Sequence, residues 1–341
     1  MAITIKDIAR EAGVSHATVS RALHDHPAIS AETIEKIKSL AARMGYVPNA
    51  SARGLKTRRS RALGVIVSNI DDPFWSEVLQ GVDEVLHPTG YSLFIAATHR
   101  DEQREKEVVQ TMVQRGVEGV ILCAPQFSQE QNRILQSYGL ATTIVNNEGA
   151  SEASYLVFND DVHGIRLLTR HLIALGHARI AYLGNQRGGR TTIERETGFR
   201  EEMHAAGLAV DERCVYLAPE GTPPGGLKGA QHLLTLDDPP TAILCYNDNM
   251  AIGVYAALHQ SGRSVPHDIS VAGYDDIAIA PYLIPPLTTL RQSKRELGAE
   301  AANMMLRILA ARGESGGLPA PQKLRLQGEL VVRGSTAPPR C

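Results

Sequence analysis

From residue 62 onward, short apolar runs alternate with longer segments whose apolar residues recur every three or four positions. The runs are rich in Val, Ile and Leu, which is typical of strands buried on both faces, and the longer segments have helical spacing. The expected strands are 63–69, 91–96, 119–123, 142–145, 180–183, 214–217, 242–245 and 270–273. The expected helices are 74–86, 101–114, 129–137, 162–175, 193–206, 225–234 and 250–260. This alternation predicts an α/β body of two lobes, each a parallel, doubly wound sheet with helices on both faces.

The first 46 residues have a different pattern, with three short helical segments and no strand. Thr4 with Asp7 three residues later resembles a capping box, and Gly13 is the kind of residue that ends a helix. Ser15 and Ser30 are the expected N-caps of the second and third helices. The pattern predicts an all-α head at the N-terminus.

Two helices joined by a short turn containing Gly form a helix-turn-helix, whose second helix enters the major groove of DNA. The polar and small residues at the start of the second helix are not needed for the core, and they are His16, Ala17, Thr18, Ser20 and Arg21. Arg21 can form a bidentate pair with guanine, and Ala17 or Thr18 can contact a thymine methyl group. The alternative is a small helical cap with a solvated polar face.

Residues 47–61 begin with a turn at Pro48-Asn49 and continue as a short potential helix followed by a basic run. Leu55 is the only large apolar residue of this potential helix, and basic residues surround it. An apolar wedge with cationic neighbours suits insertion into the minor groove. A flexible basic linker is the alternative interpretation.

The charge is distributed unevenly, although the formal net charge of the 341 residues is −2. Residues 1–61 contain 11 Lys and Arg against 5 Asp and Glu, which leaves an acidic body. Such an asymmetry indicates a segment that binds a polyanion.

Polar and aromatic residues follow the expected strands, where the carboxyl ends of parallel strands form ligand sites. The candidates for an effector site are Phe74, Trp75, Asn146, Arg190, Arg195, Asn247 and Asp275. Asn, Asp and Arg can bind vicinal hydroxyls, and an aromatic ring can cover the apolar face of a sugar. Each has a structural alternative: a helix cap for Asn247, a turn for Asp275, an ion pair with a neighbouring glutamate for Arg195, and core packing for Trp75.

Several classes of protein are disfavoured by what the sequence lacks. It contains no Walker loop, no G-x-G-x-x-G and no G-x-S-x-G, so we expect no enzyme and no cofactor. The N-terminus lacks the apolar core of a signal peptide, and no run is long enough to span a membrane, which predicts a cytoplasmic protein. The four cysteines lack metal-ligand spacing, so no metal site is expected.

With these motifs in order, the chain resembles the lactose-repressor (LacI/GalR) family of bacterial transcription regulators. The resemblance covers nearly the whole chain and rests on TIKDIAREAGVSHATVSRAL, GYVPNASARGL, LGVIVSNIDDPFW, HLIALGHARIAYLGN, ILCYNDNMAIGVYAAL, DISVAGYDDI and LVVRGST. It implies a homodimeric repressor on a pseudo-palindromic operator, switched by a small effector between the lobes. A monosaccharide is the first effector expected, and the second cation, Arg190, leaves a sugar acid as an alternative effector.

The resemblance also implies residue roles and boundaries. The positions expected to bind DNA are Thr4, Ser15, His16, Ala17, Thr18, Ser20, Arg21, Asn49, Ala52, Leu55 and Lys56. The expected divisions are a head at 1–46, a hinge helix and linker at 47–61, and an effector-binding and dimerisation domain at 62–341. Within that domain we expect a first lobe of 62–160 with 291–320, and a second lobe of 161–290 with 321–341.

One departure from the family pattern concerns the effector. Pro223 and Pro224 stand where many relatives place an aromatic wall, which leaves that side open or Trp75 as the only stacking platform. A flat purine is therefore the less expected effector. The rival functions are a sugar-binding receptor without a DNA function and an α/β enzyme that uses residues such as His163 or His177.

Overall fold

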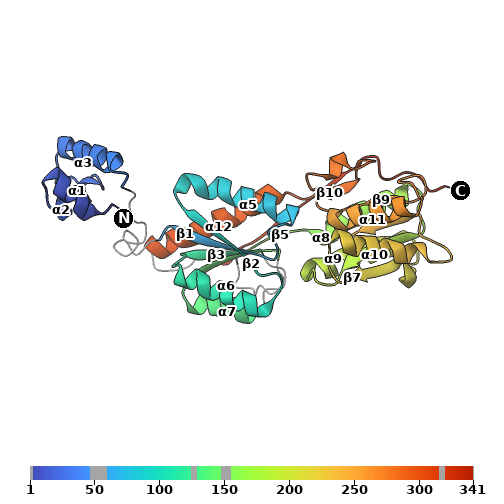
Figure 1. The fold of residues 1–341 in the computed structure, drawn as a ribbon. Coiled ribbons are helices and arrows are strands. Elements are labelled where there is room, and N and C mark those ends of the chain that lie inside the picture. Colours follow the sequence, from blue (N-terminus) through green and yellow to red (C-terminus); the bar gives the residue numbers. More distant parts are fainter. Residues whose placement is uncertain (1–2, 47–59, 124–128, 147–154, 315–318, 341) are drawn as a thin grey trace. The chain divides into compact units, whose positions relative to one another are not determined.

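The computed structural model describes residues 3–46, 60–123, 129–146, 155–314 and 319–340. The chain divides into two compact units, Met1–Ser60 and Arg61–Cys341 (Figure 1). No helix in the described part of the chain is long and apolar enough to cross a membrane.

The first unit contains the three predicted helices, which are α1 (Ile5–Ala12), α2 (His16–Ala22) and α3 (Ala31–Arg43). Their shared core includes Ile8, Val19 and Ile37. Ser15 and Ser30 cap α2 and α3 by accepting hydrogen bonds from backbone N–H groups three residues later. The expected hinge helix, with Asn49, Ala52, Leu55 and Lys56, lies outside the described residues and stays a prediction.

The first lobe of the body is a six-stranded parallel sheet in the order β11-β5-β4-β3-β1-β2. Its strands are β1 (Ala62–Val67), β2 (Ser92–Ala97), β3 (Gly119–Cys123), β4 (Ala141–Val145), β5 (Tyr155–Asn159) and β11 (Lys323–Leu326). The covering helices are α5 (Pro73–Leu86), α6 (Glu102–Gln114), α7 (Gln129–Ser137) and α12 (Lys294–Glu314). Helices α5 and α12 cover one face of the sheet, and α6 and α7 cover the other (Figure 1).

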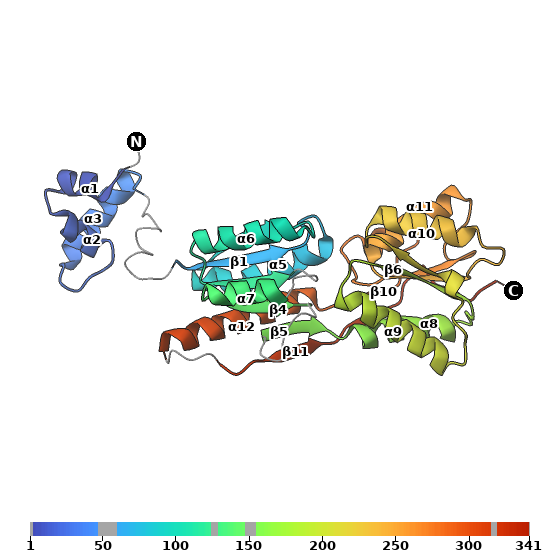
Figure 2. The same cartoon turned by 90° about the horizontal axis from the view of Figure 1, so that it is seen from below.

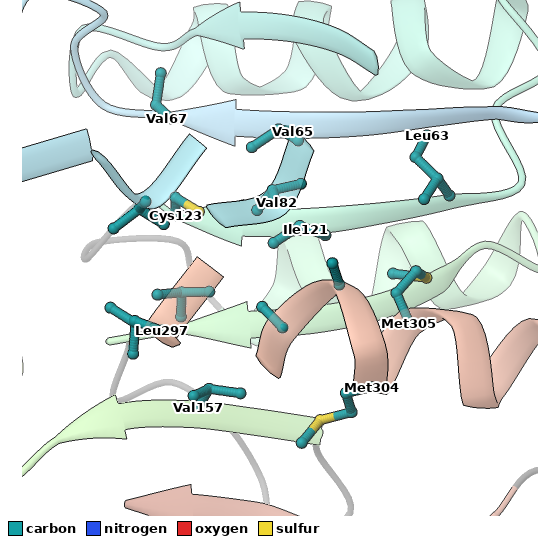
Figure 3. Close-up of a cluster of buried hydrophobic side chains, with 14 of the residues drawn as sticks. Leu63, Val65, Val67, Val82, Ile121, Cys123, Val157, Leu297, Met304 and Met305 are labelled. Carbon is teal, nitrogen blue, oxygen red and sulfur yellow. The ribbon is translucent and has the colours of Figure 1, made fainter. Parts of the chain in front are cut away.

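Alternation along β1 shows how an uninterrupted apolar run serves both faces. Val65 and Val67 belong to the cluster under α5 and α12, whereas Ile66 belongs to the cluster under α6 and α7. Figure 3 shows Val65 with Ile121 from the neighbouring strand, and Leu297 and Met305 from α12, in the first of these clusters. Full burial on both faces explains why the strand shows no polar alternation.

The second lobe has the same plan with a four-stranded parallel sheet in the order β7-β6-β8-β9. Its strands are β6 (Ile180–Asn185), β7 (Val215–Ala218), β8 (Ala242–Cys245) and β9 (Ser270–Ala272). Helices α8 (Asp161–Ala174) and α9 (Arg190–Ala205) cover one face, and α10 (Pro223–Leu234) and α11 (Asp248–Gln260) cover the other (Figure 2). The predicted fold class is confirmed.

Two expectations about the first sheet need correction. The sequence did not predict strand β5. The expectation that residues 321–341 belong to the second lobe is wrong for Lys323–Leu326. This segment is β11, which pairs in parallel with β5 and so belongs to the first sheet. Its burial pattern, with only Leu326 buried, is that of an exposed edge strand, so it lacks the apolar run that marks the central strands. After β11 the chain returns to the second lobe, where β12 (Glu329–Val331) pairs with β10 (Thr289–Arg291).

Glycines allow close helix contacts in both lobes. A Cβ added to Gly298 of α12 would lie 2.0 Å from the carbonyl oxygen of Val78 on α5, and one on Gly81 would lie 2.0 Å from that of Arg295. In the second lobe, a Cβ added to Gly226 of α10 would lie 2.0 Å from the carbonyl oxygen of Met250 on α11. One added to Gly253 of α11 would lie 1.9 Å from that of Pro223 on α10. These helix pairs therefore pack backbone against backbone.

We predict that Gly298→Ala destabilises the body by about 1–3 kcal/mol, because the added methyl group overpacks the α5–α12 contact. A loss of stability is informative because, without the helix contact, replacing glycine by alanine in a helix interior raises the free energy of unfolding by about 1 kcal/mol. Urea unfolding followed by circular dichroism measures the change. Glu296→Ala, at an exposed position of the same helix, is the control; an unchanged or increased stability of Gly298→Ala contradicts the packing argument.

Candidate functional site

The start of α2 exposes the side chains that sequence reasoning assigned to DNA. His16, Ala17 and Arg21 are exposed, and Thr18 and Ser20 are half-buried. Ser15 Oγ accepts a hydrogen bond of 3.1 Å from the Thr18 amide, so the cap fixes where the helix begins. Thr4 is exposed at the cap of α1, where its amide donates to Asp7. The head thus presents a short polar surface with no role in its own core.

In the body, loops that follow strands of both sheets line one pocket. From the first lobe come Asp72, Phe74, Trp75, Arg100 and Asn146, after β1, β2 and β4. From the second lobe come Asn185, Arg195, Tyr246, Asn247 and Asp275, around the ends of β6, β8 and β9. The empty space among these residues is about 540 Å³, counting space open to solvent.

Six of the seven predicted effector residues line this pocket, and Arg190 does not. Arg190 instead faces a second pocket, where it contacts the carbonyl oxygen of Asn159 and the carboxylates of Asp161 and Glu194. In this structure Arg190 therefore lies outside the lining of the pocket where its charge was expected. Because α9 already begins at Arg190, Arg190 and Arg195 lie five residues apart on one helix and point in different directions.

Arg195 is buried and held on several sides. Its Nε donates to Asp161 Oδ1 at 2.8 Å and its Nη1 to the carbonyl oxygen of Tyr246 at 2.6 Å. Its guanidinium carbon lies 3.8 Å from the ring centroid of Tyr274 and 4.5 Å from that of Tyr246. The structural alternative of an ion pair with a neighbouring glutamate is therefore not what forms: Arg195 pairs with Asp161 and makes a preorganised wall of the pocket.

Asp275 lies 3.9 Å from Arg195 (Oδ1 to Nη1) and accepts a hydrogen bond from the Gln292 amide. Its backbone has φ of 117°, a conformation that side-chain-bearing residues adopt at a cost and that clusters at functional sites. Burial raises the pKa of Asp275 well above its ordinary value, and Arg195 opposes that rise. A ligand hydroxyl that donates to this carboxylate therefore replaces solvation that the fold has removed.

The two predicted asparagines combine structural and lining roles. Asn247 Oδ1 accepts from the Met250 amide at 2.9 Å, which caps α11, so the structural alternative is correct for this side chain. Its Nδ2 donates to the Gly221 carbonyl at 2.9 Å. Asn146 has φ of 50°, and its Oδ1 accepts from the Asn159 amide. Both side chains are thus held in place at the rim.

Sequence reasoning missed several lining residues, of which Arg100 changes the electrostatics most. Arg100 follows β2, has φ of 58°, and its Nε is buried without a hydrogen-bond partner among the described residues. Burial raises the pKa of Asp72, and Arg100 counteracts this rise. The loop of Arg100 carries no local motif, and only the end of a strand at Ala97 points to it.

The aromatic surface is larger than Trp75 alone. Phe74 and Tyr246 also line the pocket, but Arg195 covers the ring of Tyr246 and Phe74 packs against Trp75, so Trp75 as the only stacking platform stays a prediction. Trp75 packs edge-on against Phe74 with ring centroids 4.9 Å apart and belongs to the core of the first lobe as well. From the loop before Pro223, Gly221 reaches the pocket.

A capped three-helix head and a two-lobed body with a pocket between parallel sheets define a DNA-binding regulator with a ligand-binding domain. Residues 4–49 match the bacterial regulatory proteins of the lacI family, and residues 169–336 match a periplasmic binding protein-like domain. The chain is 32% identical over 332 residues to the HTH-type transcriptional repressor PurR of Haemophilus influenzae (strain PittEE), covering 97% of this chain and 98% of that protein. The chain belongs to the LacI family.

Two solved structures show the same architecture. The Lac repressor dimer bound to operator and the anti-inducer ONPF has a TM-score of 0.86 and 26% identity, covering 99% of this chain and 100% of that one. The complex of the transcriptional regulator CelR with cellobiose has a TM-score of 0.75 and 28% identity, covering 98% and 99% of the two chains. PurR is named as a transcriptional repressor. In this chain His177, the candidate of the rival enzyme function, is buried, with Nε2 2.9 Å from the carbonyl oxygen of Ala337.

We predict that Asp161→Asn destabilises the body by about 3–5 kcal/mol, because it leaves the buried Arg195 guanidinium without its anion. Chemical denaturation at neutral pH measures the loss. Asp237→Asn, at an exposed position, is the control and is expected within about 0.5 kcal/mol of the parent. Equal stabilities of the two variants would contradict the role assigned to Asp161.

Proposed function

We propose that this protein is a cytoplasmic repressor that binds a pseudo-palindromic operator as a homodimer and is released by a sugar or sugar-derived effector. The observation that carries the proposal is the exposed start of α2, with His16, Ala17 and Arg21, in a chain that also holds the effector pocket. These side chains suit base edges in the major groove, Arg21 as the partner of guanine.

Homodimerisation is supported by apolar side chains that the body leaves exposed. Phe94 and Ile95 lie on the edge strand β2 and are 41% and 46% exposed, and Ile284 is 91% exposed. Large exposed apolar residues on an unpaired edge are typical of surfaces covered by a partner. Two heads held by such a dimer match two operator half-sites.

A sugar is supported by the polar groups that converge on the pocket. Asn146, Asn185, Asn247 and Asp275 supply donors and acceptors for several hydroxyl groups, and Trp75 supplies an apolar surface. A purine needs flat faces for stacking, and the ring of Tyr246 is already covered by Arg195. The complex of CelR, a structural neighbour, holds cellobiose, and the geometry favours a ligand of this kind. Arg100 makes a sugar acid the second candidate.

Linkage provides the mechanism of the switch. An effector that touches residues of both lobes binds best when the lobes are closed, and it shifts the equilibrium by that difference in affinity. Closure changes the spacing of the hinge segments at 47–61 in a dimer. Helices this short are marginal alone, so an ordered hinge on DNA can be lost when the spacing changes.

The DNA-binding part is tested by operator affinity as a function of salt, with a duplex selected from a random library by the protein itself. We predict a steep fall in affinity with rising salt, because phosphate contacts release counterions. Arg21→Ala is expected to cost about 1–3 kcal/mol on the selected site and little on random DNA. Arg43→Ala, which removes the same charge from α3, is the control. A flat salt response, or equal losses on both DNAs for Arg21→Ala, contradicts the assignment.

The effector site is tested by thermal shift with monosaccharides and sugar acids. A ligand at 100 times its Kd stabilises the parent by about 2.7 kcal/mol. Asp275→Ala is expected to abolish this shift and retain operator binding, since it removes the hydroxyl acceptor. Asp71→Asn, at an exposed position outside the pocket, is expected to behave as the parent. A full sugar response in Asp275→Ala refutes the site.

A further inference from the structure

A second pocket lies where the chain crosses between the two lobes. Strands β5 and β11 of the first lobe and helices α8 and α9 of the second form its walls. Its cavity volume is about 570 Å³, within the roughly 300–1,000 Å³ range for small-molecule sites. None of its lining residues lines the effector pocket.

The lining is rich in cations. Arg166 and Arg170 come from α8, Arg190 from α9 and Arg325 from β11, whereas the acidic lining residues are Asp160 and Glu194. The arginines therefore approach one space from three elements and from both lobes. Helices α8 and α9 also begin here, at Asp161 and Arg190, so their positive dipole ends add to the same potential.

An aromatic ring positions two of these cations. The guanidinium carbons of Arg190 and Arg325 lie 4.7 Å and 5.4 Å from the ring centroid of Phe158. Arg325 is the partner of Phe158 in the parallel register of β11 and β5. Planar guanidinium groups fixed in this way are prepared for the oxygens of an anion.

Each of the four arginines is also paired with at least one acid, and Arg166 lies 3.7 Å from Glu201 besides its contact with Glu202. Arg166 and Arg170 share Glu202 at 2.9 Å and 2.8 Å, which orients both side chains. The contacts of Arg190 with Asp161 and of Arg325 with Asp160 are longer, at 3.5 Å each. Glu194 also pairs with Arg190, yet burial raises the pKa of Glu194 above its ordinary value.

Arg190 is the most buried of these four arginines. Its side chain is nine-tenths buried, and its Nε has no hydrogen-bond partner among the described residues. A buried donor of this kind costs about 1–3 kcal/mol unless a partner is supplied. The Nε itself is out of reach of solvent, so a ligand contacts Arg190 through the part of its side chain that lines the pocket.

We propose that this crossover pocket binds a small phosphate-bearing anion, held by Arg325 from the first lobe and by Arg166 and Arg190 from the second. A tetrahedral phosphate offers several acceptor oxygens to guanidinium groups that approach from different directions. The site goes beyond the proposed function, because it uses no residue of the effector pocket.

The buried carboxylate of Asp161 connects the two sites. Its Oδ1 accepts from Arg195 in the effector pocket, and its Oδ2 lies 3.5 Å from Nη2 of Arg190 in the crossover pocket. An anion that engages Arg190 therefore acts on the group that holds Arg195. The crossover pocket is placed to serve as a second effector site.

The test uses the full chain without DNA and titrates it calorimetrically with inorganic phosphate, at an ionic strength held constant with chloride. The parent is expected to show saturable binding that weakens by roughly tenfold or more in Arg325→Gln. Arg325 suits this purpose because its side chain is 62% exposed, so its loss leaves the core intact. Arg325→Lys, which keeps a point charge, is expected to recover part of the affinity, and Arg166→Gln is a second variant on the other lobe.

Two further variants separate this site from the other basic surfaces. Arg100→Gln alters the effector pocket and Arg21→Gln alters the head, and both are expected to bind phosphate as the parent does. Loss of phosphate binding in either of them with retention in Arg325→Gln overturns the proposal. The absence of saturable binding up to about 10 mM phosphate in the parent, with circular dichroism confirming the fold, overturns it as well.

Discussion

All strands of the two large sheets run parallel, and this constraint determines where the chain places its chemistry. Parallel strands end at one edge of their sheet, so the loops after β1, β2 and β4 gather in the first lobe and those after β6, β8 and β9 in the second. The effector pocket is lined by these loops from both lobes. Any ligand that fills it therefore touches both lobes at once.

Two of the charged groups that line the pocket are each held by a network of contacts. Arg195 is held by Asp161, a backbone carbonyl and two tyrosine rings, and Asp275 by Gln292. Such preorganisation keeps the side chains in place before a ligand arrives, which reduces the ordering cost of binding. The strained backbones of Asn146, Arg100 and Asp275 occur at the same rim, as expected where geometry serves binding.

The sequence predicted most of the parts of this structure that leave a periodic signal, although helix α12 was not among the expected helices. Central strands such as β3 and β8 were predicted at the observed bounds, because apolar runs buried on both faces stand out from their surroundings. The caps at Ser15 and Ser30 were predicted from side chains that satisfy the first backbone amides of a helix. The edge strand β11 was not predicted, because its exposed face breaks the apolar run and its partner, β5, is distant in the sequence.

The site was predicted less completely than the fold, and the reason is geometric. Arg190 and Arg195 look equivalent as residues near the start of one helix, but the phase of the helix sends only Arg195 to the effector pocket. Arg100 reaches the pocket through a left-handed backbone in a loop, and no local pattern reports that conformation. Side-chain direction in loops depends on tertiary contacts that a single sequence does not reveal.

The central claim is that the effector pocket controls the affinity of the head for DNA. The most direct measurement compares operator affinity with and without a saturating sugar identified by its stabilisation of the protein, at one fixed salt concentration. The account predicts a fall of about 5–150-fold, the range of typical allosteric coupling. A sugar that binds the protein and leaves operator affinity unchanged would contradict it.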